Sequence, residues 1–346
     1  MNDVKPRKPW ALSIQERLTL GGGILLALAL ATFMVKETGL DGKLGFTASF
    51  FFLSIFIQVL IGFLRRGKKA IGDVFASGII YSGAIAVILP VASILVLTVQ
   101  RGFAGLNLKF FTQSMESTSF LDPLGNGGVL HALLGTFYLI FFASLISVPM
   151  GIITALYLTE LRGKASGIIQ FVVQAMSGVP SVVAGLFIYA AIIVVTPIKQ
   201  SSFVGALALT ILMVPTVTRT AQEILLLIPN DLREAGLAMG ATQWKTVSTI
   251  VVPAARNGLI TAVILGIARI TGETAPLIFT LGVADKLNLN PFKDWNSALP
   301  IYVWKGLLLG TPESIQRAWS AILVLLIIIL IMFITARTLG SRSFKK

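Results

Sequence analysis

The sequence contains no cysteine, one histidine and little charge. Only 12% of its 346 residues are Asp, Glu, Lys or Arg, against about 25% in an average soluble domain. Without cysteine the chain forms no disulfide, iron–sulfur cluster or catalytic thiolate. The single histidine, His131, has no clustered carboxylates around it in the sequence, which favours an interfacial residue over a metal ligand. No Ser–His or acidic-pair constellation is visible, so we expect no enzyme and no catalytic residue.

Long apolar runs dominate what remains, because 55% of the residues are hydrophobic. A helix crosses about 30 Å of hydrocarbon with roughly 18 or more apolar residues, at about 1.5 Å each. Uncharged runs of that length lie at residues 18–35, 44–64, 74–99, 132–159, 165–196, 201–218 and 318–336. An eighth run, 257–284, contains Arg269 and Glu273. The pattern predicts an all-α, polytopic membrane protein with about eight transmembrane helices.

The net charge of +13 raises the question of a nucleic-acid partner. With eight spans, 18 Lys and Arg residues fall in predicted cytoplasmic segments and nine in outer ones, an asymmetry that follows the positive-inside rule and predicts cytoplasmic termini. Membrane lipid therefore accounts for the charge, and no nucleic acid is needed. The run at 18–35 lacks a small-x-small cleavage site, so we interpret it as a retained anchor.

The polar segment 65–73 divides the predicted spans into two and six. We expect an N-terminal transmembrane hairpin with a basic loop at residues 1–73 and a six-helix core at 74–346. Two outer loops, 100–129 and 285–316, are longer than a turn requires. They suit docking by a partner or a gate, and interfacial anchoring by their aromatic residues is an equal alternative.

The longest predicted cytoplasmic connection contains a helix–turn–helix within residues 226–253. Pro229 and Asn230 offer a helix start, and Gly240 offers a left-handed C-cap. Helical spacing resumes after Gly240, and Pro253 is expected to stop the second helix. An amphipathic interfacial helix without a partner is the alternative.

This connection resembles the EAA loop of ATP-binding-cassette (ABC) importer permeases, E-A-A-x3-G-x9-I-x-L-P. The positions that align with the motif are Glu234, Ala235, Gly236, Gly240, Ile250, Val252 and Pro253. Gly236 and Val252 depart from the pattern conservatively. The resemblance implies a type I importer permease whose coupling helix docks on a partner ATPase.

The resemblance also implies that this chain binds no cofactor, because the ATPase subunits hold ATP and Mg²⁺. The near match to a P-loop, "GFLRRGKK" at residues 62–69, ends in lysine where Ser or Thr must ligate Mg²⁺. It also follows an apolar run rather than a strand, so we interpret it as a positive-inside cluster.

Arg269 and Glu273 are four residues apart in an otherwise apolar run. With a span starting near residue 257, Arg269 lies about 18 Å deep and Glu273 one turn further on the same face. A charge in hydrocarbon costs at least roughly 2.5–3.5 kcal/mol, so each needs a partner or water. The pair is either a self-neutralising structural contact or an oxyanion site in which the guanidinium binds the anion.

The segment "IARITGETAPLIFTLG" resembles the R-x-x-G-E-T-A-P signature of PstA-type permeases of phosphate ABC importers. "SVPMGIITALYLTEL", "SGVPSVVAGLF" and "ALPIYVW" agree with the same family, over roughly residues 74–340. The resemblance implies phosphate as substrate, alternating access, and a pathway that involves Arg269, Glu273 and Thr274. Arg219 matches a basic position of the family, although an arginine snorkelling to the interface is nearly as good an interpretation.

The implied partners are a PstC-type permease, a PstB-type ATPase dimer and an extracytoplasmic phosphate-binding protein, at a bacterial inner membrane. Three alternatives remain open at this point. The substrate could be another oxyanion, such as sulfate or molybdate. A gradient-driven carrier, with Glu273 as proton relay, would need no ATPase dock. A membrane-embedded enzyme has the least support.

Overall fold

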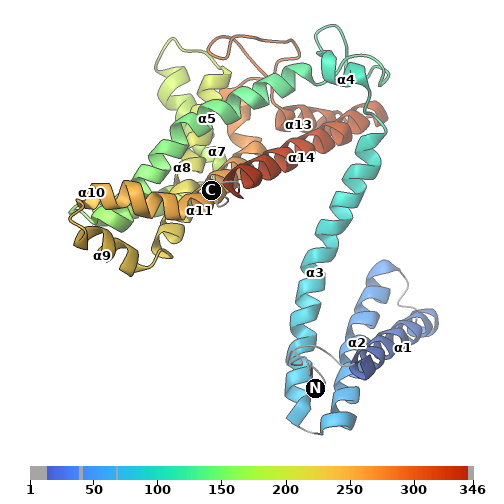
Figure 1. Cartoon of the computed structure of the whole chain (residues 1–346). Helices are drawn as coiled ribbons and strands as arrows, with labels where there is room; N and C mark the ends of the chain where they lie inside the picture. Colours follow the sequence, from blue (N-terminus) through green and yellow to red (C-terminus); the bar gives the residue numbers. More distant parts are fainter. Residues whose placement is uncertain (1–13, 39–41, 68, 342–346) are drawn as a thin grey trace, which may run out of the picture. The chain divides into compact units, whose positions relative to one another are not determined.

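The computed structural model describes residues 14–38, 42–67 and 69–341, and every regular element in these ranges is a helix (Figure 1). In chain order they are α1 (Ile14–Thr38), α2 (Lys43–Arg66), α3 (Lys69–Phe103), α4 (Leu108–Thr112), α5 (Leu130–Leu156), η1 (Tyr157–Leu161), α6 (Ser166–Ser177), α7 (Ser181–Ile188), η2 (Tyr189–Val194), α8 (Ser202–Leu226), α9 (Asn230–Ala238), α10 (Gln243–Thr246), η3 (Val247–Val251), α11 (Val252–Thr271), α12 (Ala275–Thr280), α13 (Leu299–Leu309) and α14 (Pro312–Ser341), where η marks a π-helical turn. The all-α prediction is confirmed. The basic positions counted as cytoplasmic at the two ends, Lys5, Arg7, Lys8, Arg342, Lys345 and Lys346, lie outside the described residues.

The chain divides into two compact units, residues 1–96 and 97–346. The boundary lies inside α3, whereas the sequence-based division was at residues 73 and 74. The difference arises because α3 starts at Lys69, so part of the polar segment 65–73 is helical and the first part of α3 packs in unit 1. There a Cβ on Gly78 would lie 3.6 Å from Ile55 of α2.

Small residues let α1 and α2 of unit 1 pack closely. Ala27 and Ala31 of α1 are buried with Ile57 of α2, and a Cβ on Gly23 would lie 2.9 Å from Ile61. Large apolar side chains on the outer faces are exposed, among them Phe52 at 69%. Exposed apolar faces of this extent suit helices surrounded by hydrocarbon.

Seven helical segments of the described residues are long and apolar enough to cross a membrane, or eight if α6 and the segment 181–194 form one span. These two segments are bent by 105° at residues 178–180. The apolar run predicted at 165–196 is therefore not one continuous helix but two segments with a break between them. Pro180 accounts for the break, because it has no N–H to donate and it disfavours helical backbone at Val179. Its own ψ of 140° lies outside the helical region.

The predicted span at 257–284 is also wrong in its bounds, because the continuous helical segment is 243–271. The helix passes through Pro253 rather than stopping there. The π-helical turn η3 ends two residues before Pro253, and a widened turn relieves the clash between a proline ring and the preceding carbonyls. At the other end the helix finishes at Thr271, and α12 begins after a short break.

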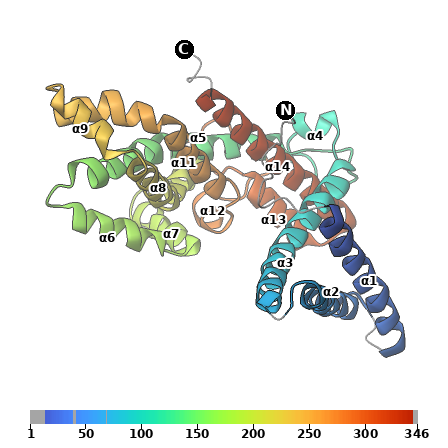
Figure 2. The same cartoon turned by 60° about the horizontal axis from the view of Figure 1, so that its bottom comes forward.

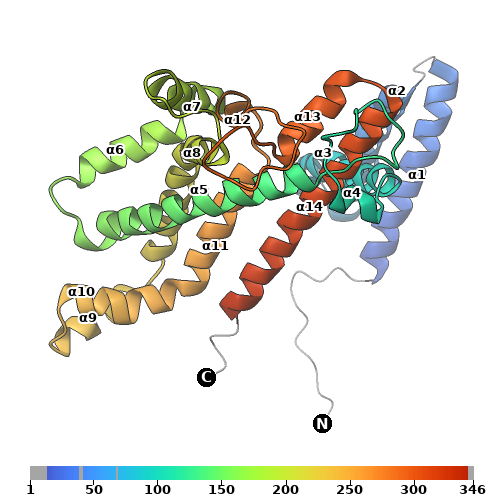
Figure 3. The same cartoon turned by 90° about the horizontal axis from the view of Figure 1, so that it is seen from above.

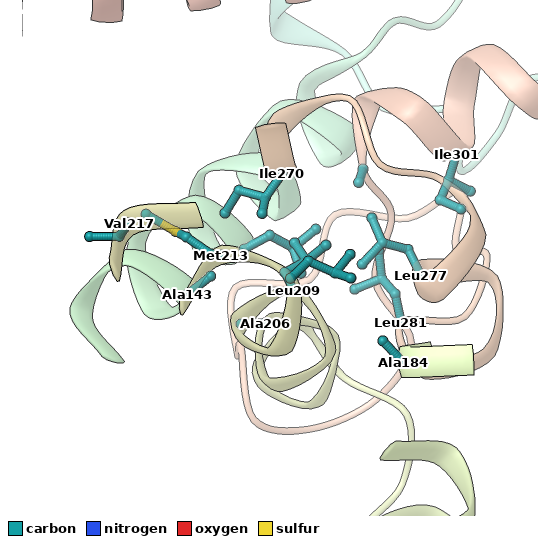
Figure 4. Close-up of a cluster of buried hydrophobic side chains, with 13 residues drawn as sticks. Ala143, Ala184, Ala206, Leu209, Met213, Val217, Ile270, Leu277, Leu281 and Ile301 are labelled. Atoms are coloured by element: carbon teal, nitrogen blue, oxygen red, sulfur yellow. The ribbon is translucent and has the colours of Figure 1, made fainter. Parts of the chain in front are cut away.

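The core of unit 2 forms where α8 meets α5, α11 and α12. Leu209 and Met213 of α8 gather with Ile270 of α11 and Leu277 of α12 (Figure 4). Glycines on both sides bring the backbones close to Val217 of α8. A Cβ on Gly151 of α5 or Gly266 of α11 would lie within 2.8 Å of that side chain. Small residues at such contacts are typical of helices that associate in membranes.

Within unit 2, α9 and α10 lie at the opposite end from α4 and α13 (Figures 1 and 3). The two predicted outer loops meet at the α4 end, where the backbone N–H of Met115 donates to the carbonyl of Asp285 at 3.0 Å. Lys305 Nζ donates to Asp285 Oδ1 at 2.7 Å. The loop at 285–316 contains the helix α13, which sequence analysis missed because it treated the segment as a long loop.

Candidate functional site

Two breaks in helices border the central part of unit 2. The first separates α6 from α7 at Gly178, Val179 and Pro180. The second separates α11 from α12 at residues 272–274. The helices after the breaks lie side by side (Figure 2), since a Cβ on Gly185 of α7 would lie 2.5 Å from the Cα of Pro276 of α12. Irregular backbone within a membrane protein is tolerated where it is buried in protein or lines a water-filled cavity.

A cavity of about 320 Å³ lies beside these breaks. Its lining comes from α6 and the first break, from α8 and from the end of α11: Met176, Ser177, Val179, Leu212, Pro215, Thr216, Arg219, Thr220 and Arg269. A cavity of this size has room for a small oxyanion together with several waters. The structure thus brings Arg219 and Arg269, which are 50 positions apart in the sequence, to one cavity.

Both guanidinium groups of this cavity are available to a ligand. Among the described residues, neither Arg219 nor Arg269 has an ion pair or a hydrogen bond, and both are exposed. Arg219 shares the continuous helix α8 with Glu223, yet no ion pair joins them in the described part of the chain. An arginine presents its donors in a planar fork that matches the oxygens of phosphate or a carboxylate.

Two hydroxyls on the cavity wall use their hydrogens elsewhere. Ser177 Oγ donates to the carbonyl of Val173 at 2.9 Å, and Thr216 Oγ1 donates to the carbonyl of Leu212 at 3.1 Å. A hydroxyl has one donor and two acceptor lone pairs. With the donor occupied, these oxygens present acceptors to the cavity. Sequence analysis missed both residues, because hydroxyls in an apolar helix carry no distinctive pattern.

Glu273 and Thr274 lie in the second break. The prediction that Arg269 and Glu273 stand one turn apart on a single helical face is wrong, because α11 ends at Thr271 and Gly272 has φ −98° and ψ 2°. The N–H of Glu273 donates to the carbonyl of Ile270 at 3.2 Å, and the carbonyl of Thr274 accepts from Leu277 N–H at 3.1 Å. No ion pair joins Glu273 to Arg269 in the described ranges, and neither Glu273 nor Thr274 is among the residues that line the cavity.

The predicted helix–turn–helix is present at the far end of unit 2. α9 begins at Asn230 after Pro229 and ends at Ala238, and Gly240 follows with φ 80°. Glu234 and Ala235 are exposed on α9, whereas Gly236 is buried. A Cβ on Gly236 would lie 2.7 Å from Thr246 and 2.8 Å from Ile250. Gly236 therefore allows α9 to pack closely against Thr246 and Ile250 of its own chain.

A partly buried ion pair joins α9 to η1, at the end of α5. Arg233 donates from Nε and Nη2 to the two carboxylate oxygens of Glu160, at 2.9 and 2.8 Å. The Glu160 side chain is 5% exposed. The hydrogen-bonded carboxylate raises the pKa of Arg233 above its ordinary value. Sequence analysis missed this pair, because nothing in the sequence connects residues so far apart.

Comparisons with known proteins give a consistent result. The family described as "binding-protein-dependent transport system inner membrane component" matches residues 147–344. A protein named phosphate transport system permease protein PstA 1 from Mycobacterium tuberculosis is 36% identical over 267 residues, which is 77% of this chain and 86% of the relative. The PstA of Haemophilus influenzae is 33% identical over 75% of this chain and 90% of its own length. The PstA of Yersinia pestis is 33% identical over 81% and 92%.

A solved structure has a similar fold. An inward-facing conformation of the MetNI methionine ABC transporter includes a chain that matches with a TM-score of 0.50 and 20% sequence identity. The match covers 63% of this chain and 95% of that chain.

Proposed function

Because the chain belongs to the family of binding-protein-dependent transport system inner membrane components, we propose that it is the permease subunit of an ATP-driven importer of inorganic phosphate. The observation that carries the proposal is the cavity with two free guanidinium groups beside two broken helices. The names of the relatives in three organisms support phosphate as the substrate.

Two arginines match a substrate that carries one or two negative charges near neutral pH. Each can bind phosphate oxygens bidentately, and the pair compensates the charge when the anion leaves water. The cavity is partly open, so its dielectric constant exceeds that of a dry interior and weakens the attraction. A weak, transient site suits transport, because a tight one would retain the substrate.

Acceptors on the cavity wall favour phosphate over sulfate. Near neutral pH phosphate still carries a proton on oxygen, and it can donate that proton to Ser177 Oγ or Thr216 Oγ1, whose own hydrogens are occupied. Sulfate has no proton to give, so its oxygens would face oxygen lone pairs. A site that leaves a polar group unpaired in the wrong substrate discriminates strongly.

The broken helices and α9 suggest how access alternates. α9 and its turn at Gly240 are the proposed dock for an ATPase dimer of the PstB type, which would hold ATP and Mg²⁺. A PstC-type permease would complete the pathway, and an external phosphate-binding protein would deliver substrate to loops 100–129 and 285–316. The charge distribution supports cytoplasmic termini in a bacterial inner membrane. The breaks supply short segments that can absorb backbone rotation.

A gradient-driven carrier is the second candidate, and it would use Glu273 as a proton relay. Its support is weaker, because Glu273 is not among the residues that line the arginine cavity and such a carrier needs no dock like α9. Import of sulfate or molybdate through the same cavity is a further alternative. Its support is weaker, because an oxyanion without a proton cannot donate to Ser177 Oγ or Thr216 Oγ1.

Reconstitution of the complete complex in liposomes tests the proposal. We expect uptake of radiolabelled phosphate that needs ATP and the binding protein and that survives collapse of the proton gradient. Uptake that persists with a hydrolysis-deficient ATPase and stops with the gradient would identify a carrier instead. Sulfate and molybdate as competitors distinguish the oxyanions, because a phosphate importer should lose little uptake at equal competitor concentration.

A further inference from the structure

Arg233 occupies a junction between three elements. Besides the carboxylate of Glu160 in η1, its guanidinium reaches the end of α8, where Nη2 donates to the carbonyl of Leu225 at 2.9 Å. Nη1 donates to the carbonyl of Ile228 at 2.6 Å, just after α8. A third contact within α9 joins Nη1 to Asn230 Oδ1 at 3.3 Å. One side chain on α9 thus binds the ends of both α5–η1 and α8.

The partner carboxylate depends on this arginine. Glu160 is 5% exposed, and a buried carboxylate is costly unless it is paired and hydrogen-bonded. A bidentate guanidinium satisfies both oxygens with fixed geometry. The backbone carbonyl of Glu160 is also used, because Gln243 Nε2 of α10 donates to it at 2.6 Å. Both halves of the helix–turn–helix are therefore fastened to residue 160.

α9 has two faces with different contacts. Arg233 and Gly236 are three positions apart, so they lie on the same side of the helix. Both face other segments of the same chain. Glu234, Ala235 and Ala238 lie on the other side of the helix, and all three are exposed. The exposed side is free for a partner, while the inner side connects to α5 and α8, and α8 carries Arg219 and Thr216 of the cavity.

We propose that the Arg233–Glu160 pair is the link that transmits displacement of α9 to α5 and α8, and through α8 to the arginine cavity. Arg233 and Glu160 are positioning residues, since neither contacts the cavity. The inference rests on the proposed function, because it needs a partner that moves α9. It assigns the transmission to one side-chain junction, rather than to the helix–turn–helix as a whole.

The chain's lack of cysteine permits a direct test. Thr220→Cys places a single thiol on the cavity wall, and its rate of modification by a charged thiol reagent reports access to the cavity. The rate is measured on this chain by mass spectrometry, in the full complex in lipid nanodiscs, with and without ATP and Mg²⁺. Glu160→Gln, Arg233→Gln and the double variant are compared in this background.

In the Thr220→Cys chain with Glu160 and Arg233 unchanged, addition of ATP and Mg²⁺ should change the rate at which the introduced thiol is modified, that is, the labelling rate. In each single variant we expect that change to shrink by at least about tenfold, as expected when a hydrogen-bonded charge pair is broken. The ATPase should still co-purify and hydrolyse ATP. The double variant should be no worse than either single one, because the residues act as a unit. Lys164→Gln is the control: it removes a charge from an exposed position between η1 and α6, four residues after Glu160, and should leave the response to ATP unchanged.

Three results would overturn the inference. They are an ATP response that persists in both single variants, a loss of response that matches loss of the ATPase subunit, and an unaltered junction in which ATP leaves the labelling rate constant. Phosphate does not enter this readout. A complex that responds to ATP but takes up no phosphate therefore contradicts the proposed substrate, while the inference about Arg233 is still judged on labelling.

Discussion

At the scale of single residues, the proposed phosphate site combines charge to attract an anion with acceptors to select one. Arg219 and Arg269 supply the charge. The hydroxyl oxygens of Ser177 and Thr216 supply the acceptors, because each hydroxyl already donates its hydrogen to a backbone carbonyl. The proposal predicts different phenotypes for the two kinds of group: loss of charge should reduce entry of any oxyanion, and loss of an acceptor should change which oxyanion enters.

Thr216→Val tests the selecting role. The substitution removes the acceptor with little change in volume, and the loss of one hydrogen bond to a charged ligand is worth roughly 1.5–3 kcal/mol. We expect the concentration of sulfate that halves phosphate uptake to fall by about tenfold or more. Thr210→Val is the matched control, because Thr210 makes the same kind of bond to Ala206 on α8 but does not line the cavity. Equal sulfate inhibition in both variants would contradict the role of Thr216.

Gly240 gives a second prediction at this scale. Its φ of 80° lies in the left-handed region, which costs other L-residues roughly 1–2 kcal/mol and β-branched ones more. Gly240→Val should therefore weaken binding of the ATPase subunit by about tenfold, whereas Gly240→Asn should bind nearly as the wild type does, because Asn tolerates this conformation. Titration of the ATPase onto the purified permeases measures the difference. Similar binding by the two variants would show that the backbone of this turn does not matter for docking.

At the scale of elements, the breaks decide the site, and sequence analysis foresaw only part of them. Pro90, Pro149 and Pro215 lie inside helices, while Pro180 and Pro276 lie at breaks. The residue type is the same, so the outcome depends on whether neighbours satisfy the freed backbone groups. Pro253 shows the same limit, because the π-helical turn before it keeps the helix continuous.

The broken helix explains why the predicted i,i+4 geometry of Arg269 and Glu273 is wrong. A charge in an apolar run is visible in the sequence at once. The i,i+4 geometry, in contrast, assumes a helix that continues, and α11 ends between the two residues. The cavity itself needs α6, α8 and α11 together, and no local pattern predicts that three-helix contact.

The packing of α7 on α12 can be tested by one methyl group. In Gly185→Ala, the new Cβ would lie 2.5 Å from the Cα of Pro276 and 2.9 Å from its carbonyl oxygen. Backbone atoms cannot yield as a side-chain end does, so we expect a loss of roughly 1–3 kcal/mol in stability. Thermal unfolding of the purified protein should show a lower midpoint. Gly167→Ala on α6 is the control, because a Cβ there meets nothing within 4 Å, and a midpoint equal to that control would contradict the packing.

At the scale of the whole molecule, the candidate cavity and α9 belong to unit 2. The fold class and the approximate spans were predictable. The thickness of the bilayer sets how many consecutive apolar residues a spanning helix needs, and runs of that length are visible in the sequence. The helix α13 was not predictable in this way, since 11 residues are too few to span and its apolar side chains pack on the outer loops. The predicted division of the chain between residues 73 and 74, into an N-terminal hairpin and a transport core, stays a prediction.

Removal of residues 1–66 tests that division. Deletion of two spans preserves the orientation of those that follow, because an even number of crossings is lost. The cavity and α9 are built only from residues of unit 2. We therefore expect the shortened chain to assemble and to import phosphate at a rate within about twofold of the full chain. Loss of uptake in a fully assembled complex would assign the N-terminal hairpin a part in transport.

The most direct measurement is the uptake of radiolabelled phosphate by complexes that carry Arg269→Gln or Arg219→Gln, normalised to the amount of assembled complex in ATP-loaded liposomes. Lys199→Gln, an exposed lysine outside the cavity, is the charge-matched control. Each arginine variant should lose at least about tenfold in uptake, the cost of one charged hydrogen-bonding group, while assembly and basal ATP hydrolysis persist. Uptake at the level of the lysine control, or a loss that only follows loss of assembly, would contradict the account.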